Sequence, residues 1–383
     1  MIERATNLPS GITQRQDLPR ASRIVVKVGS SSLTTLAGGM SEEALSSLVD
    51  RLAAVKTSGV ELILVSSGAI AAGLAPLDLS RRPRDLATQQ AAASVGQGLL
   101  MAKYTQAFSA HGVTVGQVLL TADDLIRRQQ YANAFRALNR LLALGVVPIV
   151  NENDTVANHE IRFGDNDRLA ALVAHLVKAD ALVLLSDVDA VYDAPPNDGG
   201  VRVPDIESDV ALSLLDIGTT GGAGLGTGGM ATKVEAATMA AEAGIPALVT
   251  STANAAAALA GEDVGTWFAA RGGRRSTRML WLAHLASTRG RLILDPGAVD
   301  AVASGVASLL AAGITGLNGS FEAGDAVEIT DADGGLVARG LVNFSSEELP
   351  QMLGRSTSEL GENLGDQYER SVVHVDDLVV VRL

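Results

Sequence analysis

The chain is predicted to be an α/β protein, with a mostly parallel sheet sandwiched by helices and a second, smaller β-rich domain. Strand-like and helix-like segments alternate over roughly the first 265 residues, and the strand-like runs are almost continuously apolar. Such runs are typical of parallel strands that are buried on both faces. After about Gly265 the pattern changes to short strands separated by turns. A length of 383 residues also exceeds what one core usually holds.

The elements of the first domain can be placed one by one. Ser41 can cap a helix in which Leu45, Leu48 and Leu52 recur at helical spacing, and Gly59 ends it. Strands and helices are separated elsewhere by the same criteria. The predicted strands are 23–29, 60–68, 113–121, 146–151, 180–188 and 245–251, and the predicted helices are 41–59, 84–112, 127–145, 166–179 and 230–244.

The second domain is predicted from a hairpin around Asp333-Gly334-Gly335, further short strands and one helix near Ala298–Ala312. Four arginines in "RGGRRSTR" mark a basic hinge before it. The expected boundaries are 1–21 for a flexible N-terminal extension, 22–266 for the first domain, 267–288 for a linker, 289–367 for the β-rich domain and 368–383 for a C-terminal strand or tail.

Composition excludes several classes of protein. The chain has no cysteine, so disulfides, thiolate metal sites and thiol catalysis are absent, and its five histidines form no HExxH pair. No apolar run approaches the roughly 20 residues that span a bilayer. The polar start lacks the apolar core of a secretory signal, so we expect a cytoplasmic protein without membrane contact. A net charge of −13 argues against broad binding to nucleic acid.

Polar and small residues follow several predicted strands, where ligands of a parallel sheet bind. Lys27 interrupts the apolar run "IVVKVG" and needs either an anionic partner or a path to water. Asn151, Glu152, Asn153 and Asp154 follow another strand. This acid and amide stretch is either a solvated loop or a site that holds a ligand.

A glycine-rich segment, "GGAGLGTGGMATK", leads into the helix that carries Lys233. Backbone N–H groups in such a loop, together with a helix N-terminus, favour phosphate. "GLGTGG" matches GxGxxG, but it follows no strand, so a dinucleotide fingerprint is not indicated, and no P-loop motif occurs. Two lysines, a glycine-rich lid and hard oxygen ligands together suggest phosphoryl transfer.

The segments "VVKVGSSSL", "ILVSSGAIAAG", "PIVNENDTVA", "GDNDRLAALVA", "LLSDVDAVY" and "GLGTGGMATKVEAA", in that order, resemble the glutamate-phosphorylating branch of the amino acid kinase family, whose C-terminal region is similar to a PUA domain. The resemblance covers about residues 22–265 and continues beyond them. It implies that ATP, with Mg²⁺, phosphorylates the γ-carboxylate of L-glutamate. This is the first step of proline synthesis, and proline commonly inhibits it.

The resemblance also implies roles for individual residues. Lys27 and Lys233 would contact the ATP phosphates, and Asp167 would orient both lysines. The expected glutamate-binding residues are Ser67, Asp154 and Asn166. Ser186 and Asp187 would lie near the nucleotide, and the phosphate lid would consist of Thr227, Gly228, Gly229, Met230, Ala231, Thr232 and Lys233. "VSSGA" has Ser66, and the lid has Ala231, where the family often has threonine and serine.

The chemistry of the residues agrees with this reaction, since a glutamate carboxylate is already ionised at neutral pH and needs no general base. Asp154 suits the substrate ammonium, and Ser67 and Asn166 offer donors to carboxylates. The rivals are a kinase for aspartate or acetylglutamate and an RNA-binding protein. Residues 289–383 hold six arginines, no lysine and fifteen acids, so we expect no RNA binding. The resemblance further implies a homo-oligomer, a tetramer or dimer.

Overall fold

An eight-stranded sheet forms the centre of the first part of the protein. The structure is a computed structural model that describes residues 11–33, 40–121, 124–125, 128–156, 166–207, 229–271 and 288–380. The chain divides into two units, Met1–Arg274 and Arg275–Leu383. The first sheet has the order β3-β4-β2-β1-β5-β7-β8-β6. Its strands are β1 Arg23–Val28, β2 Glu61–Ser66, β3 Val115–Leu120, β4 Val147–Glu152, β5 Ala181–Ser186, β6 Asp205–Ile206, β7 Ala247–Ser251 and β8 Thr266–Phe268.

The central strand β1 pairs in parallel with β2 and β5, and the parallel pairing continues to β4, β3 and β7. Strand β8 runs antiparallel to β7. The carboxyl ends of β1, β2, β4 and β5 therefore meet at one edge of the sheet, where the sequence placed its polar clusters. The predicted fold class, a mostly parallel sheet between helices plus a smaller β-rich part, is confirmed.

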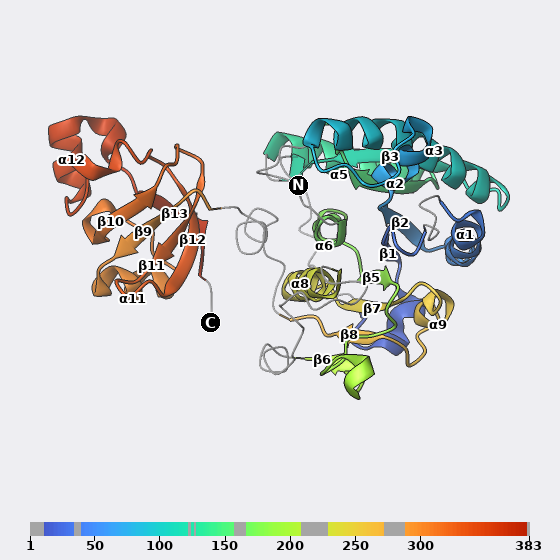
Figure 1. Ribbon diagram of the computed structural model, residues 1–383. Coiled ribbons are helices and arrows are strands. Elements are labelled where there is room, and N and C mark those ends of the chain that lie inside the picture. The colour runs from blue at the N-terminus through green and yellow to red at the C-terminus, as the bar shows by residue number, and fades with distance from the viewer. Residues whose placement is uncertain are drawn as a thin grey trace, which may run out of the picture. The chain divides into compact units, whose positions relative to one another are not determined.

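Helices cover both faces of this sheet, with α6 and α8 on one face and α1 and α9 on the other (Figure 1). Helix α1 begins where the Ser41 hydroxyl accepts a hydrogen bond from the Ala44 amide, as expected of an N-cap. The helices of this unit are α1 Glu42–Thr57, α2 Ala69–Leu74, α3 Leu86–Ser109, α5 Arg128–Ala143, α6 Asn166–Leu176, α8 Gly229–Glu242 and α9 Ala255–Leu259, with 3-10 turns η1 Arg15–Arg20, η2 Ala75–Leu77 and η3 Pro196–Asp198.

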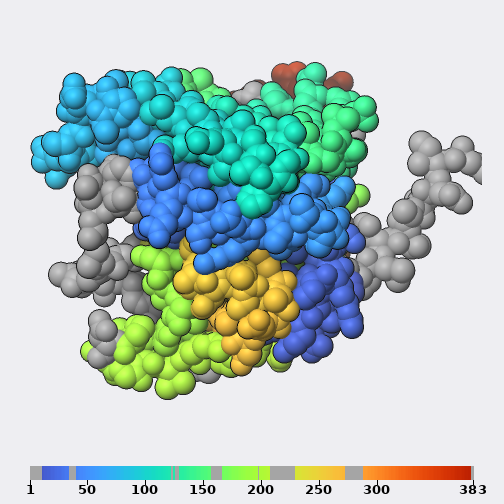
Figure 2. Space-filling view, turned by 90° about the vertical axis from the view of Figure 1, so that its right-hand side faces the viewer, coloured from blue at the N-terminus to red at the C-terminus, as the bar shows by residue number. Residues whose placement is uncertain are grey.

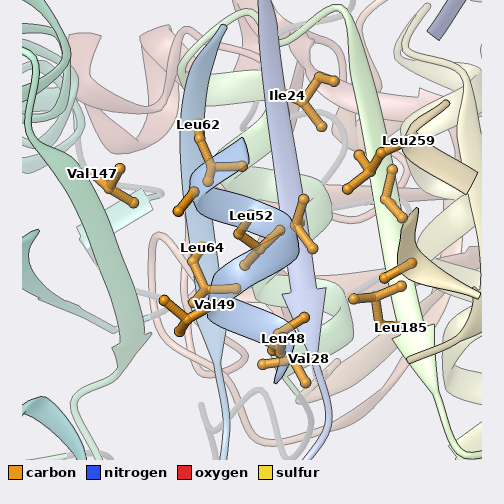
Figure 3. Packing of buried hydrophobic residues seen from close by; sticks show 14 of the residues in the cluster. Ile24, Val28, Leu48, Val49, Leu52, Leu62, Leu64, Val147, Leu185 and Leu259 are labelled. Atoms are coloured by element: carbon orange, nitrogen blue, oxygen red, sulfur yellow. The ribbon is translucent and has the colours of Figure 1, made fainter. Parts of the chain in front are cut away.

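The core of the first unit lies between α1 and the sheet. In Figure 3, Leu48 and Leu52 of α1 lie over Leu62 and Leu64 of β2 and over Val28 of β1. All of these side chains are fully buried. Burying one such leucine side chain contributes about 1.5–3 kcal/mol, so this layer fixes the position of β1 and the site residues at its end.

Two glycines let helices α2 and α3 approach each other at backbone distance. A Cβ on Gly73 would lie 2.0 Å from the Ala92 carbonyl oxygen, and a Cβ on Gly96 would lie 1.8 Å from that of Ala69. No side chain fits in either place. Gly96 therefore lets α3 lie directly against α2. The polar residue that follows it, Gln97, accepts a hydrogen bond from Asn151 of β4.

Residues 11–21 differ from the predicted flexible extension. Leu18 is fully buried, and the 4% exposed Arg15 forms ion pairs with Asp205 and Asp263. These contacts reach nearly 250 positions along the chain, so local sequence could not reveal them. Turn η1 lies against α9 (Figure 2). Residues 1–10 lie outside the described part of the chain.

The predicted linker, 267–288, begins too early. Trp267 and Phe268 belong to β8 and are 3% and 0% exposed, because they pair with Leu248 and Ala247 of β7. Residues 272–287 lie outside the described ranges.

The second unit is a five-stranded sheet with the order β10-β9-β11-β12-β13. The hairpin predicted around Asp333 joins β11 and β12. Helix α11 is shorter than expected, since Gly305 follows it with a positive φ of 73°. The elements are β9 Gly290–Leu294, β10 Ile314–Gly319, β11 Ala326–Thr330, β12 Leu336–Val342, β13 Val373–Val380, α11 Pro296–Ala303 and α12 Thr357–Leu364, with turns η4 Ala311–Gly313, η5 Leu349–Gln351 and η6 Asp366–Tyr368.

Within the described residues, we find no helix with the length and apolarity that a membrane crossing requires.

Candidate active site

Three buried charges meet beside the carboxyl end of β1. Lys27 Nζ lies 2.6 Å from Asp167 Oδ1, and Lys233 Nζ lies 2.9 Å from Asp167 Oδ2. The three residues are 2%, 0% and 6% exposed. One carboxylate thus bridges two ammonium groups in a buried environment. The anionic partner that Lys27 needed is Asp167.

Each member of this cluster comes from a different element. Lys27 is the fifth residue of β1, Asp167 lies in the first turn of α6, and Lys233 lies in the first turns of α8. A carboxylate in the first turn of a helix is stabilised by the helix dipole. Lys233 Nζ also donates to the Gly229 carbonyl oxygen at 3.1 Å, which holds the ammonium at the start of α8. Two helix N-termini therefore face this cluster, and both favour anions.

A cavity of about 300 Å³ opens next to Lys27. Its wall combines cations, carboxylates, hydroxyls and amides with the backbone that leaves β2. Such a mixture suits a small charged ligand rather than an apolar one. The lining residues are Lys27, Gly29, Ser30, Ser31, Ser67, Gly68, Ala69, Ile70, Ala71, Leu74, Arg82, Asn151, Glu152, Asp154 and Asn166.

A chain of amides runs behind the cavity. Asn166 Nδ2 lies 3.0 Å from Ser67 Oγ and 2.8 Å from Asn151 Oδ1, and it also lies 2.8 Å from the Ser66 carbonyl oxygen. Asn151 Nδ2 in turn donates to Gln97 Oε1 at 2.8 Å. The two hydrogens of the Asn166 amide are thus committed to protein acceptors. The role of Asn166 as a donor to the glutamate carboxylates stays a prediction, although the residue does line the cavity.

A buried tyrosine contacts the last residue of β2. Tyr104 is fully buried in α3, and its hydroxyl lies 2.8 Å from Ser66 Oγ. Burial raises the pKa of Tyr104 above its ordinary value, so the hydroxyl stays protonated at all physiological pH values. The pair anchors the end of β2, from which Ser67 follows.

The residues expected near the nucleotide lie at the end of β5. Ser186 is 4% exposed, and its hydroxyl lies 3.0 Å from Asp187 Oδ1. Thr252 N donates to the Ser186 carbonyl oxygen at 2.9 Å, which ties this end to β7. Asp187 is exposed. Neither residue lines the cavity beside Lys27.

The predicted phosphate lid is only partly described. Thr227 and Gly228 lie outside the described residues. The remaining lid residues, Gly229 to Lys233, form the first turns of α8. Thr232 Oγ1 lies 3.4 Å from Asp167 Oδ2, so this helix start contacts the lysine cluster directly.

The structure thus brings most predicted residues together. Lys27, Asp167 and Lys233 form one cluster, while Ser67, Asp154 and Asn166 share the cavity that Lys27 also lines. Among the described residues, no group of three or more histidine, aspartate or glutamate side chains could hold a metal ion.

Two residues of this region had no signal in the sequence. Arg82 lines the cavity, yet it lies in the basic stretch "SRRPRD", which is typical of a solvated loop. Gln97 ends the amide chain, yet it is one of four glutamines in α3. Only tertiary contact distinguishes either residue from its neighbours.

Comparisons with known proteins agree with this arrangement. Residues 22–251 match the model of the amino acid kinase family, and residues 290–362 match the PUA domain. The chain is 61% identical over 368 residues to glutamate 5-kinase of Streptomyces coelicolor, which covers 96% of this chain and 98% of that one. It is 58% identical over 376 residues to glutamate 5-kinase of Thermobifida fusca, with 97% of each chain covered.

A solved structure supports the fold. Carbamate kinase from Giardia lamblia, bound to AMP-PNP, superposes with a TM-score of 0.51 at 16% identity and covers 66% of this chain and all of that one. The family match spans more than half of the sequence and includes every residue of the lysine cluster and the cavity wall. From these matches we conclude that the chain belongs to the amino acid kinase family, a family of phosphotransferases, and carries a PUA domain after its kinase domain.

Proposed function

We propose that this chain transfers the γ-phosphoryl group of ATP to the γ-carboxylate of L-glutamate. A carboxylate oxygen of glutamate forms the new bond to the γ-phosphorus, and the bond from that phosphorus to the β,γ-bridging oxygen breaks. The products are γ-glutamyl phosphate and ADP, and no proton has to move. The observation that carries the proposal is the pair of buried lysines on Asp167, beside a polar cavity.

The lysines supply what this reaction needs. Negative charge spreads over the equatorial oxygens of the transferring phosphoryl group, so catalysis depends on fixed cations and positioning. Lys27 and Lys233 are held by Asp167 and need little reorganisation when the phosphate arrives. Removing one such electrostatic contact typically lowers kcat by about 10²–10³-fold.

The cavity supports an amino-acid substrate. Asp154 is a suitable partner for the α-ammonium, and the Ser67 hydroxyl is a suitable donor to a carboxylate. Arg82 adds a further cation to the wall of the cavity, and it comes from a different segment of the chain than Lys27 and Lys233. The amide hydrogens of Asn166 are engaged by protein acceptors, so a direct contact of this amide with glutamate would replace one of these hydrogen bonds.

ATP would lie along the N-terminus of α8 and the end of β5. The proposed contacts are Lys27, Ser186, Asp187 and the lid from Thr227 to Lys233. Mg²⁺ would enter with the nucleotide and be held by phosphate oxygens, which it prefers along with water. Both oxygens of Asp167 are taken by lysines, so this carboxylate orients cations rather than binding the metal. When bound, Mg²⁺ neutralises charge on the phosphates.

The similarity to glutamate 5-kinases supports the proposal that this chain catalyses the first step of proline synthesis. Inhibition by proline, a homo-oligomeric state and a cytoplasmic location belong to the same proposal. Light scattering would give the oligomeric state, and a titration with proline would test the inhibition.

A direct assay tests the reaction. The purified chain would be given Mg²⁺-ATP with glutamate, aspartate, N-acetylglutamate or carbamate, and ADP release would be followed by a coupled enzyme system. We expect turnover with glutamate and at least about 100-fold lower kcat/KM with the other three acceptors. Turnover with aspartate or N-acetylglutamate in preference to glutamate would contradict the proposal.

A further inference from the structure

We infer that Gln97, which lies outside every motif, is a positioning residue that acts through Asn151 and Asn166 to fix the Ser67 hydroxyl as a donor to the substrate carboxylate. The inference rests on the proposed function, since it names how that substrate is held. Gln97 lies in α3 and is 8% exposed, and it does not line the cavity.

The direction of each hydrogen bond in the chain is set by backbone groups. The Glu152 amide donates to Asn151 Oδ1 at 2.9 Å, so that atom must be the acceptor. The Ser66 carbonyl oxygen can only accept, so the Asn166 atom beside it must be the donor Nδ2. Both asparagine amides therefore have one orientation that satisfies these neighbours.

The remaining contacts follow from that orientation. With its oxygen engaged, Asn151 presents Nδ2 to Gln97, whose Oε1 accepts at 2.8 Å. The two hydrogens of Asn166 Nδ2 are shared among three acceptors, which are the Ser66 carbonyl oxygen, Asn151 Oδ1 and Ser67 Oγ. Gln97 thus closes the inner end of the chain, and Ser67 forms the end at the cavity.

Ser67 consequently has its hydroxyl hydrogen left for a ligand. The hydroxyl oxygen accepts from Asn166, and a serine hydroxyl carries a single hydrogen. Ser67 lines the cavity and is only partly buried, so that hydrogen is available to an incoming carboxylate. Without the Gln97 acceptor, the buried Asn151 amide nitrogen would lose a hydrogen bond, and the Asn151 side chain would reorient toward another acceptor. The position of Asn166, which donates to Asn151 Oδ1, would then no longer be fixed.

Kinetics of matched variants test this role. Gln97→Met keeps the length of the side chain but removes the acceptor, while Gln97→Glu keeps an acceptor oxygen. Gln106→Met makes the same change at an exposed position of α3. We expect Gln97→Met to raise the KM for glutamate about 5- to 10-fold, the scale of one neutral hydrogen bond, with kcat and the KM for ATP changed less than about 3-fold. Gln97→Glu should recover most of the loss, and Gln106→Met should match the wild type.

A double variant separates positioning from a general packing effect. If Gln97 acts through Ser67, Gln97→Met should add less than about 2-fold to the KM of Ser67→Ala. The same 5- to 10-fold increase in that background would overturn the inference, as would a wild-type KM in Gln97→Met or equal losses in the Met and Glu variants. If Gln97→Met does not fold, Gln97→Asn, which withdraws the acceptor by one methylene, takes its place. A wild-type protein inactive on glutamate would instead refute the proposed function, and the variants would then be compared on the acceptor it uses.

Discussion

The described residues of the first unit bury positive charge in two places, around Arg15 and around Lys27, and the two places differ in what surrounds the charge. The Arg15 guanidinium donates to Asp263 Oδ1 at 2.7 Å, to Asp205 Oδ1 at 2.9 Å, to the Val264 carbonyl oxygen at 3.0 Å and to that of Pro204. Two carboxylates and two carbonyls thus surround this cation, and Asp263 also pairs with Arg202. Around Lys27, by contrast, the Asp167 carboxylate lies between two ammonium groups, and the cluster adjoins a cavity.

The contrast separates a structural charge from a functional one. Arg15 links η1 to the segments before β6 and β8. Its guanidinium donates to four protein acceptors. The lysine cluster adjoins a polar cavity that a small charged ligand can enter. The adjoining cavity, rather than burial alone, therefore indicates the site.

The largest effect is expected in the lysine cluster. Lys27→Ala or Lys233→Ala should lower kcat by at least about 10²-fold while the KM for glutamate changes little, because each ammonium neutralises charge that develops during phosphoryl transfer. Steady-state kinetics at saturating Mg²⁺-ATP would measure this. Lys103→Ala, which removes an ammonium that pairs with Glu42 and does not line the cavity, serves as the control and should keep normal kcat. Near-normal kcat in Lys27→Ala would remove this residue from the mechanism.

A smaller effect is expected at the carboxylate of the cavity. Asp154→Asn should raise the KM for glutamate by the equivalent of about 1.5–3 kcal/mol, roughly 10- to 150-fold, because a hydrogen bond between charged groups is lost. The kcat should stay within a few-fold of the wild type. Glutarate, which lacks the ammonium, provides the control substrate. Its KM should not rise in the variant, and an equal rise for both substrates would show that Asp154 does not bind the ammonium.

The smallest effect on chemistry is expected from the second unit, which buries no charged residue among those described. Deleting residues 280–383 should leave glutamate kinase activity detectable and alter oligomer size or the response to proline. The intact protein should not bind total tRNA at micromolar concentration in about 0.15 M salt, because residues 289–383 carry a net charge of −9. Micromolar binding that Arg→Ala changes at Arg274 and Arg275 weaken would reverse this expectation.

The sequence predicted those features that depend on local pattern. Continuous apolar strands gave the parallel sheet, and Lys27 was visible because a lysine interrupts one of them. Asp167 was identified through the resemblance of "GDNDRLAALVA" to the amino acid kinase family. The short strand β8 was missed, because three residues carry too little pattern to separate a strand from a linker.

Features that depend on distant contacts could not be predicted. Arg15 looks like part of a polar tail until its partners, about 190 and 248 positions away, are in place. The sequence pattern does not distinguish Gln97 from the other glutamines of α3. Its role depends on the close approach of α3 to α2 at Gly96 and on the hydrogen bond from Asn151. The protein acceptors of Asn166 were hidden for a similar reason, since they come from β2, from β4 and from the residue after β2.

The central claim is that the Lys27 charge serves catalysis and the Arg15 charge serves stability, and paired methionine variants test it most directly. Thermal unfolding and kcat at 25 °C would be measured for both. Lys27→Met should lower kcat at least about 10²-fold with little change in Tm, because Lys233 still pairs with Asp167. Arg15→Met should lower Tm by about 5–10 °C with kcat within 2-fold, because two carbonyls and Asp205 lose the Arg15 donor and Asp263 keeps only Arg202 as its arginine partner among the described residues. The reverse pattern, with kcat lost at Arg15 and stability lost at Lys27, would contradict the account.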